Sequence, residues 1–523
     1  MQRARHIRYI WLAALVAAGL TGARVSAAQL SVTPEEKDLQ AVLDRAADGD
    51  EVLLTPGTYR GPLRITRSIT LAGTTGSVVA GSGEGSVITV SAPGAVVRDL
   101  EVRGSGRSLE KMDSGIFVEQ SATRAIVENN RIEGNLFGIY LHGAPDALAR
   151  HNVIVGLRQA RISETGNGVT VWNAPGAKVI DNDFRYGRDG IFAISSRNNV
   201  FSGNRFRDLR FAVHYMYTND GEITNNVSRG NIIGYALMFS KHLVVRDNIS
   251  DHDRDRGILF NSTNGSQIIG NAVVGGLQPV ERWATSDNRA SEEGVPQSEG
   301  GAATQVRSER PGPEKCVFIY NTNNNRFEGN WFEGCEIGVH FTAGSEGNDI
   351  TGNAFVNNVN QVKYVGSRNL DWSKGGRGNY WSDNPAFDLN GDGIADTAYR
   401  PNDLIDRVLW TAPAAKVLVN SPAVQVIRWA QAQFPALLPG GVVDSHPLVS
   451  PPPRRYVPES LNHDADRSHR RGHQALRPHR RGDRRLLCSR QRRDGGADRS
   501  QRRRQDHADE ADARPDPSDP RLD

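Results

Sequence analysis

Asparagine recurs with a fixed period along the middle of the chain, and this feature limits the possible folds most strongly. Each repeat reads Asn, any residue and then an apolar residue, often after Gly, at Asn130, Asn152, Asn182, Asn204, Asn226, Asn248, Asn271, Asn330 and Asn353. The successive gaps are 22, 30, 22, 22, 22, 23, 59 and 23 residues. The gaps of 30 and 59 residues each correspond to one repeat plus an inserted segment. Such a period is typical of a solenoid.

Between the asparagines lie short segments in which apolar residues alternate, such as 115–118, 138–141 and 190–193. This alternation predicts strands with one buried face. The spacing leaves no room for helices between strands, so βαβ units are excluded. We therefore predict an all-β, right-handed parallel β-helix of the pectate-lyase type, with three short strands in each coil of about 22 residues. Asn suits its corners because Asn tolerates left-handed geometry and its amide can bond the next coil.

A stack of coils exposes unpaired strand edges at both ends, so we expect short helical caps. Thr33-Pro34-Glu35-Glu36 is a helix start that precedes Leu39, Val42, Leu43 and Ala46. Ser421-Pro422 starts a second helix, within a C-terminal cap of about 401–438 that also suits docking near a membrane. The predicted β-helix domain spans 29–452. Its insertion 275–315 is rich in Gly, Ser, Glu and Pro, which predicts a flexible arm or a partner-docking loop, with plain disorder as the alternative.

The two ends of the chain differ from this domain. Residues 1–28 combine basic residues, a short apolar run and small residues at 25–27, which predicts a signal peptide and export. Residues 453–523 form a separate tail, with 19 Arg and no Lys from Arg454 onward. The chain has 63 Lys and Arg against 60 Asp and Glu, but the two ends together hold 23 of the basic and 13 of the acidic residues, which leaves 40 against 47 for the domain. The domain is therefore mildly acidic, and we predict no nucleic-acid partner.

The tail itself has two interpretations, a disordered segment or an out-of-frame translation. In a shifted frame with GC-rich codons, 501–514 can encode NGAGKTTLMKLMLG, a phosphate-binding P-loop. That hypothesis implies that the chain runs into a neighbouring ATPase gene. The DNA sequence decides between the two interpretations.

Cys316 and Cys335 are the two cysteines of the domain. An even number is compatible with one disulfide outside the cytosol. Two reduced thiols, one of them a copper ligand, are the alternative. The separation of 19 residues, slightly less than one coil, does not decide between the two states.

Several long runs resemble the NosD family, the periplasmic β-helix accessory proteins of nitrous oxide reductase maturation. Among them are EGNLFGIYLHGAP from residue 133, RFRDLRFAVHYMYTND from 205 and GRGNYWSDNPAFDLNGDGIADTAYRPNDL from 376. The resemblance covers 29–452 and implies a role without turnover chemistry. It implies an ABC-type permease and ATPase and a copper-carrying lipoprotein as partners, with nitrous oxide reductase receiving its copper–sulfur centre. It also implies a periplasmic location beside the inner membrane.

Soft thioether and imidazole ligands favour copper in its reduced state. The strand register that we infer puts His142, Trp172, Ile194, His214, Met238 and Phe260 in one outward column. It predicts His214 and Met238 on adjacent coils, about 5 Å apart. Transient copper binding is therefore predicted at His214, Met216, Met238, His242 and His142, with His340 outward on a later coil. The alternative is a ladder stacked for stability, or a docking surface.

A second metal motif lies near the end of the domain. Asp388, Asn390, Asp392 and Asp396 follow the spacing of a calcium loop, with Gly393 at its sixth position. Tyr399 replaces the usual bidentate Glu. Structural calcium is one interpretation, and plain Asx turns are the other.

A carbohydrate-active β-helix enzyme, a lyase, hydrolase or epimerase, is the rival functional class. It needs an acid and a base or nucleophile on adjacent coils. The run 251–256 (DHDRDR) is the best candidate, and Asp181, Asp183 and Asp189 are weaker ones. Charge runs between strands are usually solvated corners, so we predict no enzyme.

Overall fold

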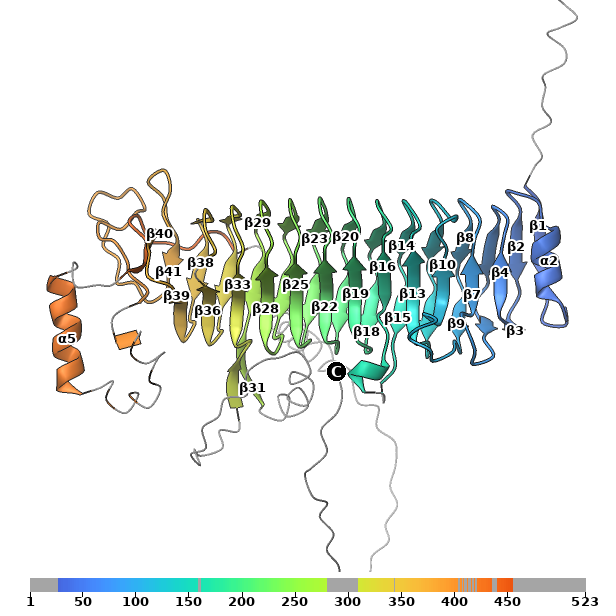
Figure 1. The fold of residues 1–523 in the computed structure, drawn as a ribbon, viewed down its shortest axis with the longest axis horizontal. Helices are drawn as coiled ribbons and strands as arrows, with labels where there is room; N and C mark the ends of the chain where they lie inside the picture. The colour runs from blue at the N-terminus through green and yellow to red at the C-terminus, as the bar shows by residue number, and fades with distance from the viewer. Residues whose placement is uncertain are drawn as a thin grey trace, which may run out of the picture. The chain divides into compact units, whose positions relative to one another are not determined.

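The computed structural model describes residues 27–158, 161–279, 309–342, 344–402, 421–434 and 440–454, with scattered residues between 405 and 418. The signal-peptide prediction and nearly all of the tail lie outside these residues. The described chain is an all-parallel solenoid of about 14 turns, which confirms the predicted fold class. Figure 1 shows the coils stacked from β1 to β41, with three parallel sheets running along the stack.

The three sheets, here called A, B and C, follow one another in that order within each coil. Sheet A comprises β1 Gln29–Val32, β2 Glu51–Leu54, β5 Thr70–Gly73, β8 Val96–Arg98, β11 Ile126–Glu128, β14 Leu148–Arg150, β17 Lys178–Ile180, β20 Val200–Ser202, β23 Glu222–Thr224, β26 Val244–Arg246, β29 Gln267–Ile269, β34 Arg326–Glu328 and β37 Asp349–Thr351.

Sheet B comprises β3 Gly57–Arg60, β6 Ser77–Ala80, β9 Glu101–Arg103, β12 Arg131–Glu133, β15 Val153–Val155, β18 Asp183–Arg185, β21 Arg205–Arg207, β24 Val227–Arg229, β27 Ile249–Asp251, β30 Ala272–Val274, β35 Trp331–Glu333, β38 Ala354–Val356 and β41 Tyr380–Trp381. Sheet C, with longer strands, comprises β4 Leu63–Ile65, β7 Ile88–Val90, β10 Ser114–Val118, β13 Phe137–His142, β16 Val169–Trp172, β19 Asp189–Ile194, β22 Phe211–Met216, β25 Ile233–Met238, β28 Arg256–Asn261, β33 Lys315–Tyr320, β36 Ile337–Thr342 and β39 Asn360–Val365.

The repeated asparagines form a buried ladder at the corner between sheets A and B. The backbone N–H and the side-chain amide of Asn204 both donate to Asn226 Oδ1 on the next coil, each at 3.0 Å. The same amide donates to the Val179 carbonyl at 2.8 Å. The amide therefore bonds the next coil as predicted. The left-handed backbone, however, belongs to the residue before each ladder asparagine, for example Asn225 with φ 56° and Asp247 with φ 54°.

The inward side chains of the three sheets fill the solenoid with one continuous apolar core. Val213 and Tyr215 of β22 are fully buried, while His214 between them points to the outside of sheet C. This alternation is the reason that the outer face of sheet C is free to carry other chemistry.

The N-terminal cap begins later than predicted. Gln29–Val32 is a strand that pairs with β2, and the helix α2 (Leu39–Arg45) starts at Asp38, whose carboxylate accepts from the Ala41 N–H. Asp38 supplies the side-chain cap that Thr33 was expected to provide. Leu39 and Leu43 are buried against the first coils.

At the other end, large aromatic side chains cover the core. Trp381 stacks on Phe355 with ring centroids 4.2 Å apart, and Trp372 lies 5.4 Å from the Phe341 ring. A short sheet of β40 (Asn369–Asp371) and β42 (Gly441–Val443) holds this region. The predicted helix is present as α5 (Pro422–Gln433), capped by Ser421. None of the described helices is long and apolar enough to span a membrane.

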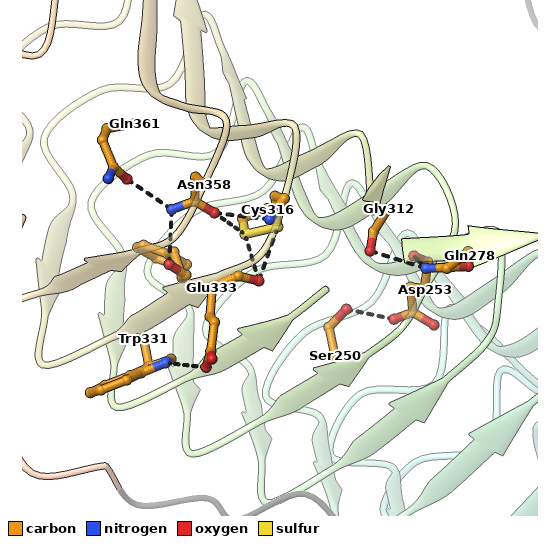
Figure 2. The surroundings of a disulfide bond; sticks show 11 residues. Ser250, Asp253, Gln278, Gly312, Cys316, Trp331, Glu333, Asn358 and Gln361 are labelled. Carbon is orange, nitrogen blue, oxygen red and sulfur yellow. Dashed lines mark hydrogen bonds between the residues drawn. A yellow bond between two sulfur atoms is a disulfide. The ribbon is translucent and has the colours of Figure 1, made fainter. Parts of the chain in front are cut away.

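The insertion leaves the corner between sheets B and C. Its two ends, β31 (Gly276–Pro279) and β32 (Glu309–Gly312), pair as an antiparallel hairpin. The middle, 280–308, lies outside the described residues. Figure 2 shows the base of the hairpin, where the Gln278 amide donates to the Gly312 carbonyl at 3.0 Å.

Directly after the hairpin, Cys316 and Cys335 form a disulfide, with Cα atoms 5.6 Å apart (Figure 2). Both cysteines are buried in the core on neighbouring coils. Asn358 accepts from the Cys335 N–H at 3.0 Å and so joins the same corner to the next coil. The base of the insertion is therefore fixed covalently and by hydrogen bonds.

Candidate functional site

The outer face of sheet C carries a ladder of aligned side chains, one from each coil. Strand pairing puts them in the order Phe117, Tyr140, Thr170, Phe192, His214, Ala236, Leu259, Phe318, His340 and Lys363. Unlike the asparagine ladder, this ladder changes residue type at nearly every step. Its chemistry therefore differs from coil to coil.

A buried charged network lies beside this ladder. The Arg210 guanidinium donates to both carboxylate oxygens of Asp189, at 2.9 and 2.8 Å. His214 Nδ1 lies 3.1 Å from Asp189 Oδ2. Burial alone would raise the pKa of the Asp189 carboxyl, but the neighbouring Arg210 and His214 outweigh burial and hold that pKa well below its usual range.

Asp189 also fixes the role of one ring nitrogen of His214. A carboxylate accepts hydrogen bonds and does not donate, so Nδ1 donates to Asp189. Nδ1 also lies 3.5 Å from Arg210 Nη2. This distance is longer, and both nitrogens are donors, so the contact is not a hydrogen bond. The other ring nitrogen, His214 Nε2, is bonded by no described residue. A carboxylate behind a histidine in this way fixes the orientation of the ring.

The network forms one side of a cavity of about 290 Å³ on this face of sheet C. Four consecutive members of the ladder, from Tyr140 to His214, line it. Its walls come from two long loops, 104–113 and 156–168, which leave the corner between sheets B and C. Leu109 and Met112 belong to the first loop, and Thr165 and Asn167 to the second.

The sequence-based pairing of His214 with Met238 is wrong. His214 is aligned with Ala236 on the next coil, and Met238 is aligned with Met216. Phe260, expected in the same outward column, is fully buried in the core. The two methionines are thus the neighbours, on adjacent strands about 4.8 Å apart. Just beyond them, the exposed rings of Tyr217 and Phe239 stack with centroids 4.9 Å apart.

Two other predicted copper ligands lie away from this pair. Strand pairing aligns His142 with Met216, but three coils earlier, about 14 Å away along the stack. There the His142 ring stacks on the Trp172 ring, with centroids 4.4 Å apart. His242 lies in the corner between sheets C and A. Its Nδ1 is 3.2 Å from Asp220, and its ring lies over Gly265 of the following coil.

His340 belongs to the same outer ladder as His214, at the other side of the insertion. Burial and then the nearby Lys315 and Lys363 lower its pKa to about 3, so the ring is neutral. Its Nδ1 atom is buried without a hydrogen-bond partner. In the part of the chain that the structure describes, no group of three or more His, Cys, Asp and Glu side chains is arranged to hold a metal ion.

The predicted calcium loop forms a series of Asx turns. Asp388 accepts from the N–H groups of Gly391, Asp392 and Gly393, and Asp396 accepts from Leu389. Asn390 and Asp392 accept from residues two positions further on. Asx turns thus account for this sequence pattern, and calcium binding here is not supported.

The acidic residues considered for an enzyme are dispersed. In the run 251–256, Asp251 pairs with Arg229 and His252 on the outside, whereas Asp253 is inside the solenoid and accepts from Ser228 and Ser250. Among the weaker candidates, Asp183 pairs with Arg185, and Asp181 lies at an exposed corner with φ 54°. Asp189 is the acid that lines the cavity.

Comparison with known proteins identifies the family. Residues 150–386 match the family model described as "Periplasmic copper-binding protein (NosD)". A "Probable ABC transporter binding protein NosD" from Stutzerimonas stutzeri is 40% identical over 406 residues, 78% of this chain and 88% of that protein. One with the same name from Pseudomonas aeruginosa is 40% identical over 78% of this chain and 90% of that protein.

The chain belongs to the NosD family. Its relatives are named as binding proteins, which agrees with the prediction that this chain is not an enzyme. Among solved structures, the A-module of the mannuronan C-5 epimerase AlgE6 from Azotobacter vinelandii has a TM-score of 0.41 at 15% identity, over 63% of this chain and 90% of that one. The Dettilon tailspike protein also has a TM-score of 0.41, at 13% identity, over 64% and 68% of the two chains.

Proposed function

We propose that this NosD-family protein handles copper in the periplasm, as the binding partner of an ABC-type permease and ATPase. In this proposal it receives copper from a copper-carrying lipoprotein and serves the assembly of the copper–sulfur centre of nitrous oxide reductase. The family description and the names of the two relatives support the copper and transporter parts. Residues 1–28 would direct export to the periplasm, and binding to the transporter would keep the protein beside the inner membrane.

The observation that carries the copper part is the alignment of Met216 and Met238. The chain contains four methionines, and these two are direct neighbours on adjacent strands of sheet C. Both are half-buried at the edge of the outer face. Two thioethers at this distance suit Cu(I), and they leave room for a ligand from the protein that delivers or accepts the ion. Binding would then be transient.

Two exposed apolar surfaces suit the protein partners. The stacked Tyr217 and Phe239 rings lie next to the methionine pair, and we assign them to docking of the copper donor or acceptor. On α5, Val426 and Trp429 are three residues apart, so they share one helix face, and both are more than 60% exposed. We assign that face to the transporter.

The test measures Cu(I) affinity by competition with a chromogenic chelator. In Met216→Leu/Met238→Leu the side-chain volume is kept and the thioethers are lost, so we expect affinity to fall at least about tenfold. His142→Ala is the matched control, because His142 lies in the same column but outside reach of the pair. Unchanged affinity in the double variant would refute the methionine site.

The wider role is tested in cells. Without this gene, we expect nitrous oxide reductase to be made but to lack its copper–sulfur centre. Restoring residues 1–452 should return the copper content and the activity, which would also show that 453–523 is dispensable. A fully loaded reductase in cells without the gene would contradict the maturation role.

A further inference from the structure

The cavity beside Asp189 has no part in the proposed methionine site. Met216 and Met238 do not line it, and His214, which does, is aligned with Ala236 rather than with Met238. Its floor consists of ladder side chains, with Thr170 as a small residue between Tyr140 and Phe192. The small residue gives the floor its depth, and the two rings offer flat apolar contact on either side.

Three groups that line the cavity are left without a partner among the described residues. The first is the Arg188 guanidinium, which forms no ion pair there and is half-buried. The second is His214 Nε2, since only the other ring nitrogen, Nδ1, bonds Asp189. The third is Asn167 Oδ1, a buried acceptor without a hydrogen bond on a side chain that is 7% exposed.

The charges that line the cavity leave one cation for a ligand. Asp189 neutralises Arg210 through two hydrogen bonds, and no other acidic side chain lines the cavity. Arg188 is then available for an anionic group, and a guanidinium binds a carboxylate best through two parallel hydrogen bonds. Asn167 Oδ1 accepts and requires a hydroxyl donor, and His214 Nε2 also suits a hydroxyl, because a hydroxyl can both donate and accept.

We propose that this cavity binds a small hydroxylated carboxylate, with its carboxylate on Arg188 and its hydroxyls on His214 and Asn167. A cavity of about 290 Å³ is at the lower limit for small-molecule sites and suits a ligand of sugar-acid size. The rings of Tyr140 and Phe192 contact the apolar face of the ligand. Asp189 and Arg210 are positioning residues, because they act through His214.

The test is calorimetric titration of the full purified protein with D-galacturonate and D-gluconate, a cyclic and an open-chain example of this class. We expect both to bind. Galactose lacks the charge and acetate lacks the hydroxyls, so each should bind at least about tenfold more weakly. If acetate or inorganic phosphate binds as tightly, the site takes any anion, and the proposal is overturned.

Variants then locate the site. Arg188→Gln should weaken galacturonate binding about tenfold or more, and Asn167→Ala should weaken it less. Arg205→Gln, an exposed arginine on the outside of sheet B, is the matched control and should bind like the original protein. No binding by a protein that melts normally, or equal binding by Arg188→Gln, would overturn the proposal. Cu(I) affinity of Arg188→Gln should stay unchanged, which separates this site from the proposed copper function.

Discussion

Two ladders run along the same solenoid, and they differ in what decides their residues. The asparagine ladder is inside, where each amide meets the same backbone groups of the next coil, so one residue type is repeated. The ladder on the outer face of sheet C meets solvent or a loop, so its residues run from Tyr140 and Thr170 to His214 and Ala236. Repetition therefore marks the groups that hold the fold. Departure from repetition marks the groups that are free for function.

The network of Asp189, Arg210 and His214 lies at the outer ladder but is buried like the inner one, so it tests this comparison most strongly. Asp189→Asn removes the charge that compensates Arg210, whose side chain is 8% exposed. Breaking a buried pair in this way should lower the free energy of unfolding by about 4 kcal/mol. Urea unfolding measures it. The loss should be present in full above the ordinary pKa of an aspartate and shrink as the pH falls below it. It should disappear only as the pH falls through the depressed pKa of Asp189 in the folded protein, because only then do both folded proteins lack the carboxylate charge.

The control for that variant is a surface pair. Glu101→Gln removes the partner of Arg103, and both side chains are more than one-third exposed. We expect a loss below about 1 kcal/mol. An equal loss in the two variants would mean that the network beside the cavity is not specially stabilising.

The inner ladder gives the next largest effect. Asn226→Ala leaves the Asn204 N–H and the Phe201 carbonyl buried without their partners. We expect a loss of about 3 kcal/mol in the free energy of unfolding. Asn261→Ala, at the outer end of a sheet C strand, should cost less than about 1 kcal/mol. A small loss in the ladder variant would break the distinction between inside and outside.

At a second corner inside the solenoid, Asn231 accepts a backbone N–H from the preceding coil, and one coil later a carboxyl group, Asp253, takes the same place. Burial raises its pKa to about 7, although Ser228, Ser250 and the Asn231 N–H donate to it. The folded protein therefore retains a proton that the unfolded chain releases, and stability should fall as the pH rises from about 4 to 7. Asp253→Asn should remove this slope and stabilise the protein at pH 8 by about 2 kcal/mol. Thermal unfolding at several pH values tests it, and an unchanged slope would contradict it.

The smallest effect is expected at the methionine pair. Met216→Leu/Met238→Leu is a volume-conserving change at the half-buried edge of the outer face, so the unfolding free energy should change by less than about 1 kcal/mol. A copper defect in this variant could then be attributed to the lost thioethers. A loss above about 3 kcal/mol would assign the pair to stability instead.

The sequence predicted the fold well because the inner ladder is a local pattern. The spacing of 22 residues between Asn204 and Asn226 already contains the strand register. The same spacing aligns His214 with residue 236, so the predicted contact of His214 with Met238 contradicted the repeat itself. The alignment of Met216 with Met238 could have been derived in the same way.

The cavity was harder to predict. Asp189 and Arg210 are 21 residues apart, about one coil, so the repeat signals their contact. Asp189 was nevertheless only a weak candidate, because two loops outside the repeat, 104–113 and 156–168, form the walls of the cavity that it lines. Their positions interrupt the repeat and can be seen in the sequence. Their paths depend on packing against sheet C, which no local pattern encodes.

The hairpin insertion has a consequence for how this family can vary. Asn271 and Asn330 are 59 residues apart, yet the Asn271 N–H bonds Asn330 Oδ1 at 2.9 Å, as in coils of 22 residues. The length of the chain that leaves the stack at this corner therefore does not change the pairing of the coils, since the disulfide and the hydrogen bond of Gln278 close the base of the insertion. Segments of other lengths could therefore leave the stack here without changing the hydrogen bonds between these coils. The corner is in effect a graft point, at which the chain can vary independently of the solenoid.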